Sequence, residues 1–308
     1  MDQPKTLLPQ QPIQYAFFGS ADFSVSVLDE MATAGFLPAL VVTTPDKPQG
    51  RKLVLTPTPV KVWAEKRTIK VISPEKLDAA FEEFLKHETT DFKIAVFIVA
   101  AYGKIIPETI LNLPPRMALN IHPSLLPQYR GASPIHAAMI DDVKNTGVTV
   151  MLVDKLMDHG PIVAQRKIII DTWPTYELLE NMLAKEGADL LVSILPNWVA
   201  NTPSIKTQML EQDHSRATFT KKITKEAGLI DINTALAGSP EEQYKIFRMI
   251  QAYHDWPSAY FFTETKKRIK ITDAAWQNGK LIIKKIIPEG KTETDFAAYM
   301  RANSAIAI

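Results

Sequence analysis

The sequence of 308 residues contains no cysteine, which excludes disulfides, thiol nucleophiles and cysteine metal sites. The six histidines lack the spacing typical of metal ligands, so we expect no metal site and an organic reaction chemistry. No apolar run approaches the length of a membrane span. The start of the chain is polar and contains proline, unlike a signal peptide. We therefore expect a cytoplasmic protein without a membrane partner.

The sequence also has little net charge, but the charge is unevenly distributed. The formal net charge is +1, and residues 1–205 carry 19 basic and 22 acidic side chains against 16 and 12 in residues 206–308. The later residues include two basic clusters, namely Lys221, Lys222, Lys225 and Lys266, Lys267, Arg268, Lys270. This asymmetry favours a basic C-terminal domain that binds a polyanion. A solvated basic surface without a ligand is the alternative.

The first two thirds of the chain alternate apolar runs with amphipathic segments. This pattern predicts an α/β fold, doubly wound around a mostly parallel sheet. Strands are expected at residues 13–18, 39–43, 69–72, 94–100, 117–121, 148–153 and 162–170. The first strand-to-helix turn is Gly19-Ser20-Ala21-Asp22 rather than Gly-x-Gly-x-x-Gly, so we expect no NAD site.

A domain boundary is expected near residue 204. A long helix is predicted over residues 175–199, and Asn201-Thr202-Pro203-Ser204 follows it as a linker. Beyond it, Ser239-Pro240-Glu241-Glu242 is a capping box that begins a helix, and short strands are expected at 258–263, 268–272 and 280–287. We therefore predict a flexible tail over 1–12, a catalytic domain over 13–204 and a small β-rich domain over 205–308.

The most informative motif lies at the end of the fifth predicted strand. Asn120 and His122 are two residues apart and so project to the same face, and Pro123 ends the strand because it has no backbone N–H. An amide donor beside an imidazole suits chemistry on a carbonyl group. Taken alone, a single histidine at a strand end is more often structural than catalytic.

A carboxylate is expected to join this pair. Residues 147–154 form another apolar strand, and the turn that follows it contains Asp158. We therefore predict that Asp158 lies next to His122. A plain turn residue is the alternative for Asp158.

The chain resembles the folate-dependent formyltransferases, whose reaction centre combines an Asn-x-His pair with a distant aspartate. The resemblance rests on Asn120-Ile-His122-Pro-Ser124-Leu125-Leu126-Pro127 and on Asp158. Residues 17–23, 45–51, 58–61 and 223–231 narrow it to the branch that formylates initiator methionyl-tRNA. The resemblance implies that Asn120, His122 and Asp158 are catalytic, that 10-formyltetrahydrofolate is the co-substrate, and that the small domain is an OB-like tRNA-binding barrel.

The same resemblance implies binding residues. The folate is expected to contact Ser124, Leu125, Leu126 and Pro127, with Val99, Ala100, Tyr102 and Gly103 completing its pocket; ordinary core packing is the alternative. The loop of residues 45–59 is expected to insert at the tRNA acceptor end, with Arg51 as the leading contact. The full set of expected tRNA-binding residues is Arg51, Lys47, Lys52, Lys221, Lys222, Lys266, Lys267, Arg268 and Lys270. We expect a monomer.

Three positions depart from the pattern of the tRNA branch. Pro161 stands where that branch usually has aspartate, and Ser133 and His136 replace a usual alanine and glutamine. An amino-sugar-nucleotide formyltransferase and a glycinamide ribonucleotide formyltransferase therefore remain alternatives, although the 46–51 loop argues against both. A non-catalytic module that binds the tRNA acceptor is a further alternative, but it would have no use for an intact catalytic trio.

Overall fold

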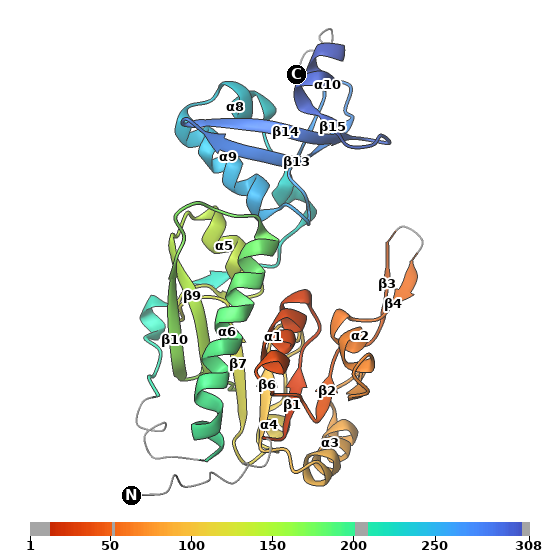
Figure 1. Ribbon diagram of the computed structural model, residues 1–308, viewed down its shortest axis with the longest axis vertical. Coiled ribbons are helices and arrows are strands. Elements are labelled where there is room, and N and C mark those ends of the chain that lie inside the picture. The colour runs from red at the N-terminus through yellow and green to blue at the C-terminus, as the bar shows by residue number, and fades with distance from the viewer. Residues whose placement is uncertain (1–12, 51–52, 201–208, 304–308) are drawn as a thin grey trace, which may run out of the picture. The chain divides into compact units, whose positions relative to one another are not determined.

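The structure is a computed structural model that describes residues 13–50, 53–200 and 209–303 (Figure 1). The described residues form two compact units. The first unit is drawn from Met1–His122, Val148–Arg166 and Ala184–His214. The second is drawn from Pro123–Gly147, Lys167–Leu183 and Ser215–Ile308.

A seven-stranded sheet organises the first unit, in the order β10-β9-β7-β6-β1-β2-β5. Its strands are β1 Tyr15–Phe18, β2 Leu40–Val42, β5 Lys70–Ile72, β6 Val96–Val99, β7 Ala118–His122, β9 Asn145–Leu152 and β10 Ile162–Ile169. The neighbours from β5 to β7 pair in parallel, whereas β9 runs antiparallel to β7. The predicted mostly parallel α/β fold is confirmed.

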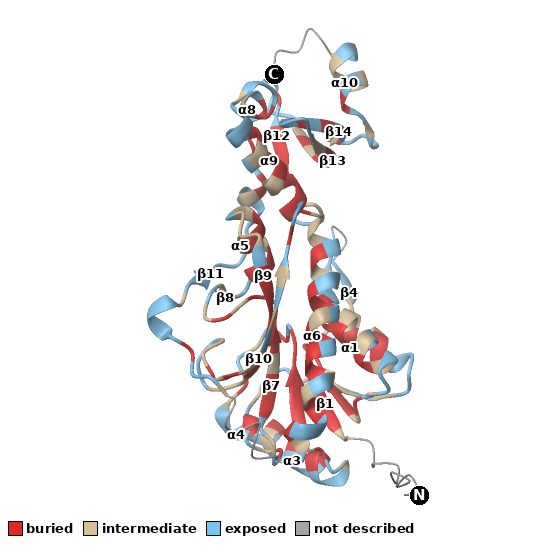
Figure 2. Cartoon of the chain, turned by 60° about the vertical axis from the view of Figure 1, so that its left-hand side comes forward, coloured by how far each residue is buried: buried red, intermediate tan, exposed pale blue. Residues whose placement is uncertain are grey.

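Apolar runs form the central strands because both faces of the sheet are covered by helices. All four residues of β1 are fully buried, and Figure 2 shows β1 and β7 coloured as buried. The helices are α1 Asp22–Thr33, α2 Pro59–Glu65, α3 Ala79–Asp91, α4 Glu108–Leu111 and α6 Tyr176–Val199. Thr58 and Asp78 start α2 and α3 by accepting a hydrogen bond from a backbone N–H of the first turn. Helix α6 confirms the long helix predicted over residues 175–199.

The expected loop of residues 45–59 contains a β-hairpin. Strand β3 Lys47–Gln49 pairs antiparallel with β4 Val54–Thr56. Leu53, Val54 and Leu55 are 71%, 60% and 65% exposed, so the hairpin presents apolar side chains to solvent. Arg51 and Lys52, expected to contact tRNA, lie outside the described residues.

The second unit contains an antiparallel sheet in the order β12-β13-β14-β15. Its strands are β12 Tyr260–Phe262, β13 Arg268–Gln277, β14 Lys280–Pro288 and β15 Thr294–Asp295. Helix α9 Pro240–Ala252 begins at the predicted capping box, in which Ser239 accepts from the Glu242 backbone. This helix packs on β13 and β14 around a separate core that includes Phe247, Ile250 and Phe261. The predicted small C-terminal β domain is confirmed.

Shorter elements complete the second unit. They are β8 Arg130–Gly131, α5 Pro134–Ile140, β11 Phe219–Thr220, the 3-10 turn η2 Lys225–Gly228, α8 Ile232–Ala237 and α10 Phe296–Ala302. The turn η1 His214–Arg216 begins at the last residue of the first unit. Strand β8 pairs in parallel with β11, and α5 packs against α9. Segments near residue 130 therefore belong to the same compact unit as the C-terminal sheet.

Each compact unit is made of three separate segments of the chain, so no single boundary in the sequence divides them. Strands β9 and β10 and helix α6 each continue from one unit into the other. The division into a catalytic domain over 13–204 and a tRNA-binding domain over 205–308 remains a prediction. The predicted tail over residues 1–12 lies outside the described residues.

Candidate active site

The candidate site begins at the end of β7, where Pro123 follows the last strand residue. Asn120 pairs with Met151 of β9 and His122 pairs with Thr149, so both side chains leave the same face of the strand. His122 is 4% exposed, and Asn120 is partly buried. Among the described residues, the Asn120 amide has no side-chain hydrogen bond. The amide is therefore available to donate to an incoming carbonyl oxygen.

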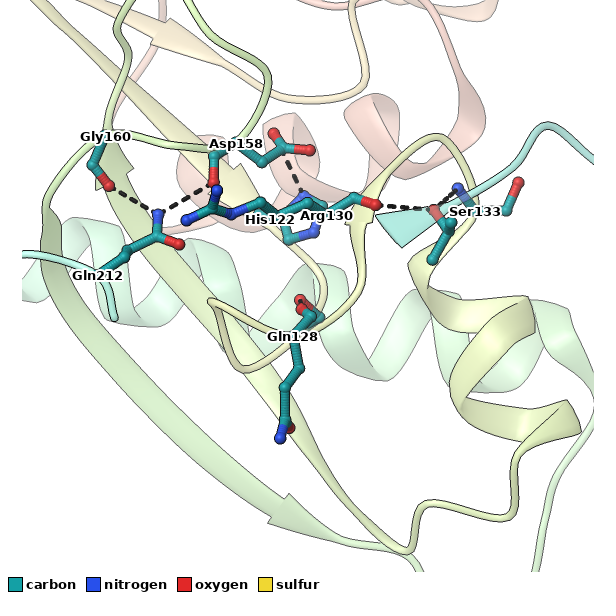
Figure 3. Close-up of polar contacts among 9 residues, drawn as sticks. His122, Gln128, Arg130, Ser133, Asp158, Gly160 and Gln212 are labelled. Atoms are coloured by element: carbon teal, nitrogen blue, oxygen red, sulfur yellow. Dashed lines mark hydrogen bonds and ion pairs between the residues drawn. The ribbon is translucent and has the colours of Figure 1, made fainter. Parts of the chain in front are cut away.

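Asp158 lies beside His122, as the sequence predicts. The Oδ1 atom of Asp158 is 3.7 Å from Nδ1 of His122, and their side chains are 15% and 6% exposed (Figure 3). This separation permits an ion pair but exceeds a direct hydrogen bond. Catalytic contacts are often this long before substrate binds. The structure thus brings an amide, an imidazole and a carboxylate to one end of the sheet.

The turn that carries Asp158 has a demanding backbone. Asp158 has a φ of +50°, which lies in the left-handed region of the backbone. Residues other than glycine, asparagine and aspartate seldom adopt this conformation. A Cβ atom at Gly160 would lie 2.1 Å from the carbonyl oxygen of Leu152, so only glycine fits there. The sequence pattern Asp-x-Gly thus has a physical basis in this turn.

A buried glutamine, which the sequence analysis did not identify, contacts this turn. The Nε2 atom of Gln212 donates to the carbonyl oxygens of Asp158 and Gly160, at 3.0 Å and 2.7 Å (Figure 3). The contact spans more than fifty residues of sequence and follows no local pattern. Only the folded structure reveals it.

The segment after β7 belongs to the second unit and contains the residues expected to contact folate. Ser124 is buried and donates to the carbonyl oxygen of Gln128 at 2.7 Å, which closes a tight loop. Leu126 is also buried, whereas Leu125 and Pro127 are partly buried. Their contact with folate remains a prediction.

The other expected folate residues lie at the end of β6 in the first unit. Val99 and Tyr102 belong to a hydrophobic core cluster, and the Tyr102 ring contacts that of Phe18 edge to face. Gly103 is exposed and has a φ of +81°. Among the described residues, the buried hydroxyl of Tyr102 has no hydrogen-bond partner. Core packing accounts for most of the Val99 and Tyr102 surface.

The expected tRNA-binding residues occupy three separate places. Lys47 is exposed on the β3–β4 hairpin. Lys221 and Lys222 line a pocket of about 430 Å³ in the second unit, which also includes His136, Phe219 and Tyr253. The third group, which we call the β13 cations, lies at the start of β13 and comprises Lys266, Lys267, Arg268 and Lys270.

Strand periodicity arranges part of the β13 cations. Arg268 and Lys270 alternate with Ile269, which is 1% exposed in the core, so the two cations share the outer face. The Arg268 guanidinium lies 3.7 Å from the centre of the Tyr260 ring. Lys266 and Lys267 are exposed just before the strand. Two of these four cations therefore lie on the outer face of the small sheet, and the other two lie just before it in the chain.

An aromatic stack lies beside the pocket in the second unit. The His136 ring stacks on Tyr176 at 4.1 Å and lies 5.9 Å from Tyr253. Burial lowers the pKa of His136 from 6.5 to about 4, because a desolvated imidazole is harder to protonate. Burial, together with the nearby Asp141 carboxylate, raises the pKa of Tyr129 to about 12. These rings are therefore neutral near pH 7.

The described part of the chain shows neither a metal-binding cluster nor a membrane-spanning helix. No group of three or more histidine, aspartate or glutamate side chains is placed to hold a metal ion. No described helix is both long and apolar enough to span a membrane.

The fold and the site match a known class of protein. A family model described as formyl transferase matches residues 13–195, which include Asn120, His122 and Asp158. A solved N-formyltransferase from Helicobacter canadensis, in complex with folinic acid and dTDP-3-aminofucose, shares the fold with a TM-score of 0.59. It is 18% identical, and the match covers 85% of this chain and 87% of that one. The class is thus that of the formyl transferases.

Sequence relatives narrow the class. The chain is 35% identical to a methionyl-tRNA formyltransferase from Listeria monocytogenes, over 92% of this chain and 94% of the relative. It is 40% identical to one from Halalkalibacterium halodurans, over 80% of this chain and 74% of the relative. The chain belongs to the formyl transferase family, in the group of the methionyl-tRNA formyltransferases.

Proposed function

We propose that this protein transfers the formyl group of 10-formyltetrahydrofolate to the α-amino group of methionine on initiator methionyl-tRNA. The observation that carries the proposal is the convergence of Asn120, His122 and Asp158 at the end of β7. Family membership supports the reaction class, and the names of the sequence relatives support the acceptor. The product is N-formylmethionyl-tRNA, which serves translation initiation.

The reaction sets three requirements for the site. The methionine nitrogen must bond to the formyl carbon, the bond from that carbon to the folate nitrogen must break, and one proton must pass between the nitrogens. The Asn120 amide can donate to the formyl oxygen as that oxygen gains negative charge. Removal of a comparable donor in another enzyme costs about 10²- to 10³-fold in turnover.

His122 and Asp158 meet the remaining requirements. His122 can donate a second hydrogen bond, and its second ring nitrogen allows it to accept and release a proton as a general acid and base. The Asp158 carboxylate, 3.7 Å from the ring, can attract the protonated imidazole and hold a water that relays the proton. Both side chains are mostly buried, which strengthens the electrostatic interaction between them.

Several features fit a bound folate, which carries the formyl group on nitrogen. The unpaired Asn120 amide fits the formyl oxygen, and the buried Tyr102 hydroxyl, without a partner among the described residues, could accept or donate to a polar group. The apolar Leu125, Leu126 and Pro127 surface suits the flat ring system of a pterin. We propose Ser124, Val99 and Gly103 as further parts of this site.

The tRNA acceptor needs a larger and more basic surface. Phe219 is 71% exposed and lines the same pocket as Lys221 and Lys222. An exposed aromatic ring beside cations is a typical surface for unpaired nucleotides. The β13 cations can hold phosphates, and the exposed apolar residues of the hairpin with Lys47 can contact the acceptor end. Arg51 and Lys52 remain proposed contacts from the sequence alone.

We also propose that residues 13–204 catalyse the transfer and residues 205–308 bind tRNA. The compact C-terminal sheet with its own core supports the second part of this proposal. We expect the protein to act as a monomer in the cytoplasm, where charged tRNA is available. Sedimentation of the pure protein tests the oligomeric state directly.

The decisive experiment compares acceptors. Pure protein is incubated with 10-formyltetrahydrofolate and, in parallel, initiator methionyl-tRNA, an amino-sugar nucleotide or glycinamide ribonucleotide. Formyl transfer is followed by mass spectrometry of each acceptor. We expect formylation of methionyl-tRNA alone. Formylation of either small molecule in place of methionyl-tRNA would overturn the proposed acceptor. Formylation of none of the three would overturn the proposed formyltransferase activity.

A further inference from the structure

We propose that Gln212 is a positioning residue that holds the Asp158 turn and thereby sets the distance from the Asp158 carboxylate to His122. The inference deepens the proposed function and rests on it for the role of Asp158. Gln212 would not touch substrate. Its effect on formyl transfer would pass entirely through the backbone of the turn.

The contact itself is specific. Gln212 is 4% exposed, and its amide nitrogen has two hydrogens for two acceptors, the carbonyl oxygens of Asp158 and Gly160. Asp158 and Gly160, both labelled in Figure 3, are two residues apart in the sequence, with His159 between them. One side chain therefore fixes the backbone on both sides of the residue that follows the catalytic carboxylate. A buried amide held in this way has little freedom to release either carbonyl.

The turn needs such support because its own backbone is not regular. Asp158 has a φ of +50°, and Gly160 lies close against the Leu152 carbonyl. Just beyond the turn, Ile162 and Leu210 exchange two backbone hydrogen bonds of 2.8 Å and 2.9 Å. Gln212 follows Leu210 by two residues and so extends the same contact along the chain. Residues 210–212 thus act together as a strap over the turn.

A second contact holds the middle of the turn. The rings of His159 and His214 stack with centres 4.0 Å apart and planes 7° from parallel. The Nδ1 atom of His159 is 2.7 Å from a carboxylate oxygen of Asp154. Asp154 also accepts a hydrogen bond from the backbone N–H of Leu156 at 2.9 Å. Three consecutive residues of the turn, 158 to 160, are therefore each held by a contact from outside it.

The consequence for catalysis is geometric. His122 and Asp158 are 3.7 Å apart, so even a small movement of the turn away from His122 would separate them beyond ion-pair range. Misplacement by about 1 Å of a catalytic group can cost about 100-fold in rate. We therefore expect loss of the Gln212 amide to lower turnover about 10- to 100-fold, with little change in KM for either substrate.

The test uses Gln212→Met, which keeps the length of the side chain but removes both donors. Gln212→Glu is the second variant, because it keeps the shape and places a carboxylate against two carbonyl oxygens. The matched control is Gln243→Met. Gln243 is also buried, at 8% exposure, and its amide bonds the backbone of Gly238 and Leu281 in the C-terminal sheet domain. This control can lower stability, but turnover per folded molecule should not change.

A double-mutant comparison separates positioning from general destabilisation. Gln212→Met should slow single-turnover formyl transfer about 10- to 100-fold in the wild-type background, and no more than about 2-fold when Asp158 is already Asn. A merely structural role would slow both backgrounds equally, and that result would overturn the proposal. Unchanged turnover in both Gln212 variants would overturn it as well.

Hydrogen exchange gives a readout that needs no substrate. In Gln212→Met, amides of residues 155–160 should exchange faster than in wild type, while the C-terminal sheet domain should not change. Unchanged exchange in this turn would show that Gln212 does not hold its backbone, and would overturn the proposal whichever acceptor the protein uses. Failure of the wild-type protein to formylate methionyl-tRNA would instead count against the proposed function, so the two failures are distinguishable.

Discussion

Replacement of His136 by glutamine tests whether a half-buried imidazole makes this protein sensitive to mild acid. The His136 ring stacks with the rings of Tyr176 and Tyr253, and desolvation lowers its pKa from 6.5 to about 4. Glutamine is similar in size to histidine and carries no titratable group. The variant therefore removes one proton-binding site and leaves the others in place.

The sign of the effect follows from the direction of the shift. The folded pKa lies below the unfolded one, so the unfolded chain binds more protons between them. The stabilisation from the neutral ring is fully present above pH 6.5 and is lost as the pH falls to about 4. The fall in the pKa of His136 from 6.5 to about 4 corresponds to about 3 kcal/mol of folding free energy in total. About 2 kcal/mol of this is lost between about pH 7.5 and pH 5.

The assay compares urea unfolding of the wild-type protein and His136→Gln at both pH values. On acidification, the free energy of unfolding of the wild-type protein should fall by about 2 kcal/mol more than that of the variant. In thermal unfolding, the same difference corresponds to about 4–8 °C in the midpoint. His87→Gln is the control, because the His87 side chain is 74% exposed and its replacement should change the difference little. A stability difference that is the same at both pH values would refute the reasoning.

Three further predictions concern the site and the tRNA surface. Asn120→Ala should lower turnover by at least about 10²-fold at unchanged stability, since it removes a donor to the reacting oxygen; equal turnover at saturating substrates would contradict this. Gly160→Ala should lower turnover and the unfolding midpoint together, because its Cβ would lie 2.1 Å from the Leu152 carbonyl; a crystal structure with an unmoved turn would contradict it. Replacing the β13 cations by alanine should raise the KM for tRNA and flatten its salt slope by about one unit per lost phosphate contact; an unchanged slope would remove them from the tRNA surface.

The sequence predicted the parallel sheet well because its signal is local and strong. Strands such as β1 and β6 are buried on both faces and therefore appear as uninterrupted apolar runs. The Asn120, His122 and Asp158 cluster was also predictable, because strand periodicity and a turn after the neighbouring strand fix their positions. The β3–β4 hairpin was missed. Its short strands contain Pro48 and exposed residues, which give no burial pattern to detect.

Long-range contacts escaped the sequence analysis for a different reason. The parallel pairing of Arg130 with Phe219 involves only two residues on each side and joins segments far apart in the chain. Gln212 presents the same difficulty, because a lone glutamine beyond the long helix gives no sign that it bonds Asp158. Such contacts depend on where the folded chain brings its segments, which no local pattern encodes.

The measurement that tests the central claim most directly is single-turnover formyl transfer from 10-formyltetrahydrofolate to initiator methionyl-tRNA, in wild type, His122→Ala, Asp158→Ala and the double variant. If the two side chains act as one unit in moving the proton, each single change should cost at least about 10²-fold and the double change should cost little more than the worse single. Losses that multiply in the double variant would contradict a coupled role. Absence of transfer by the wild-type protein would contradict the function itself.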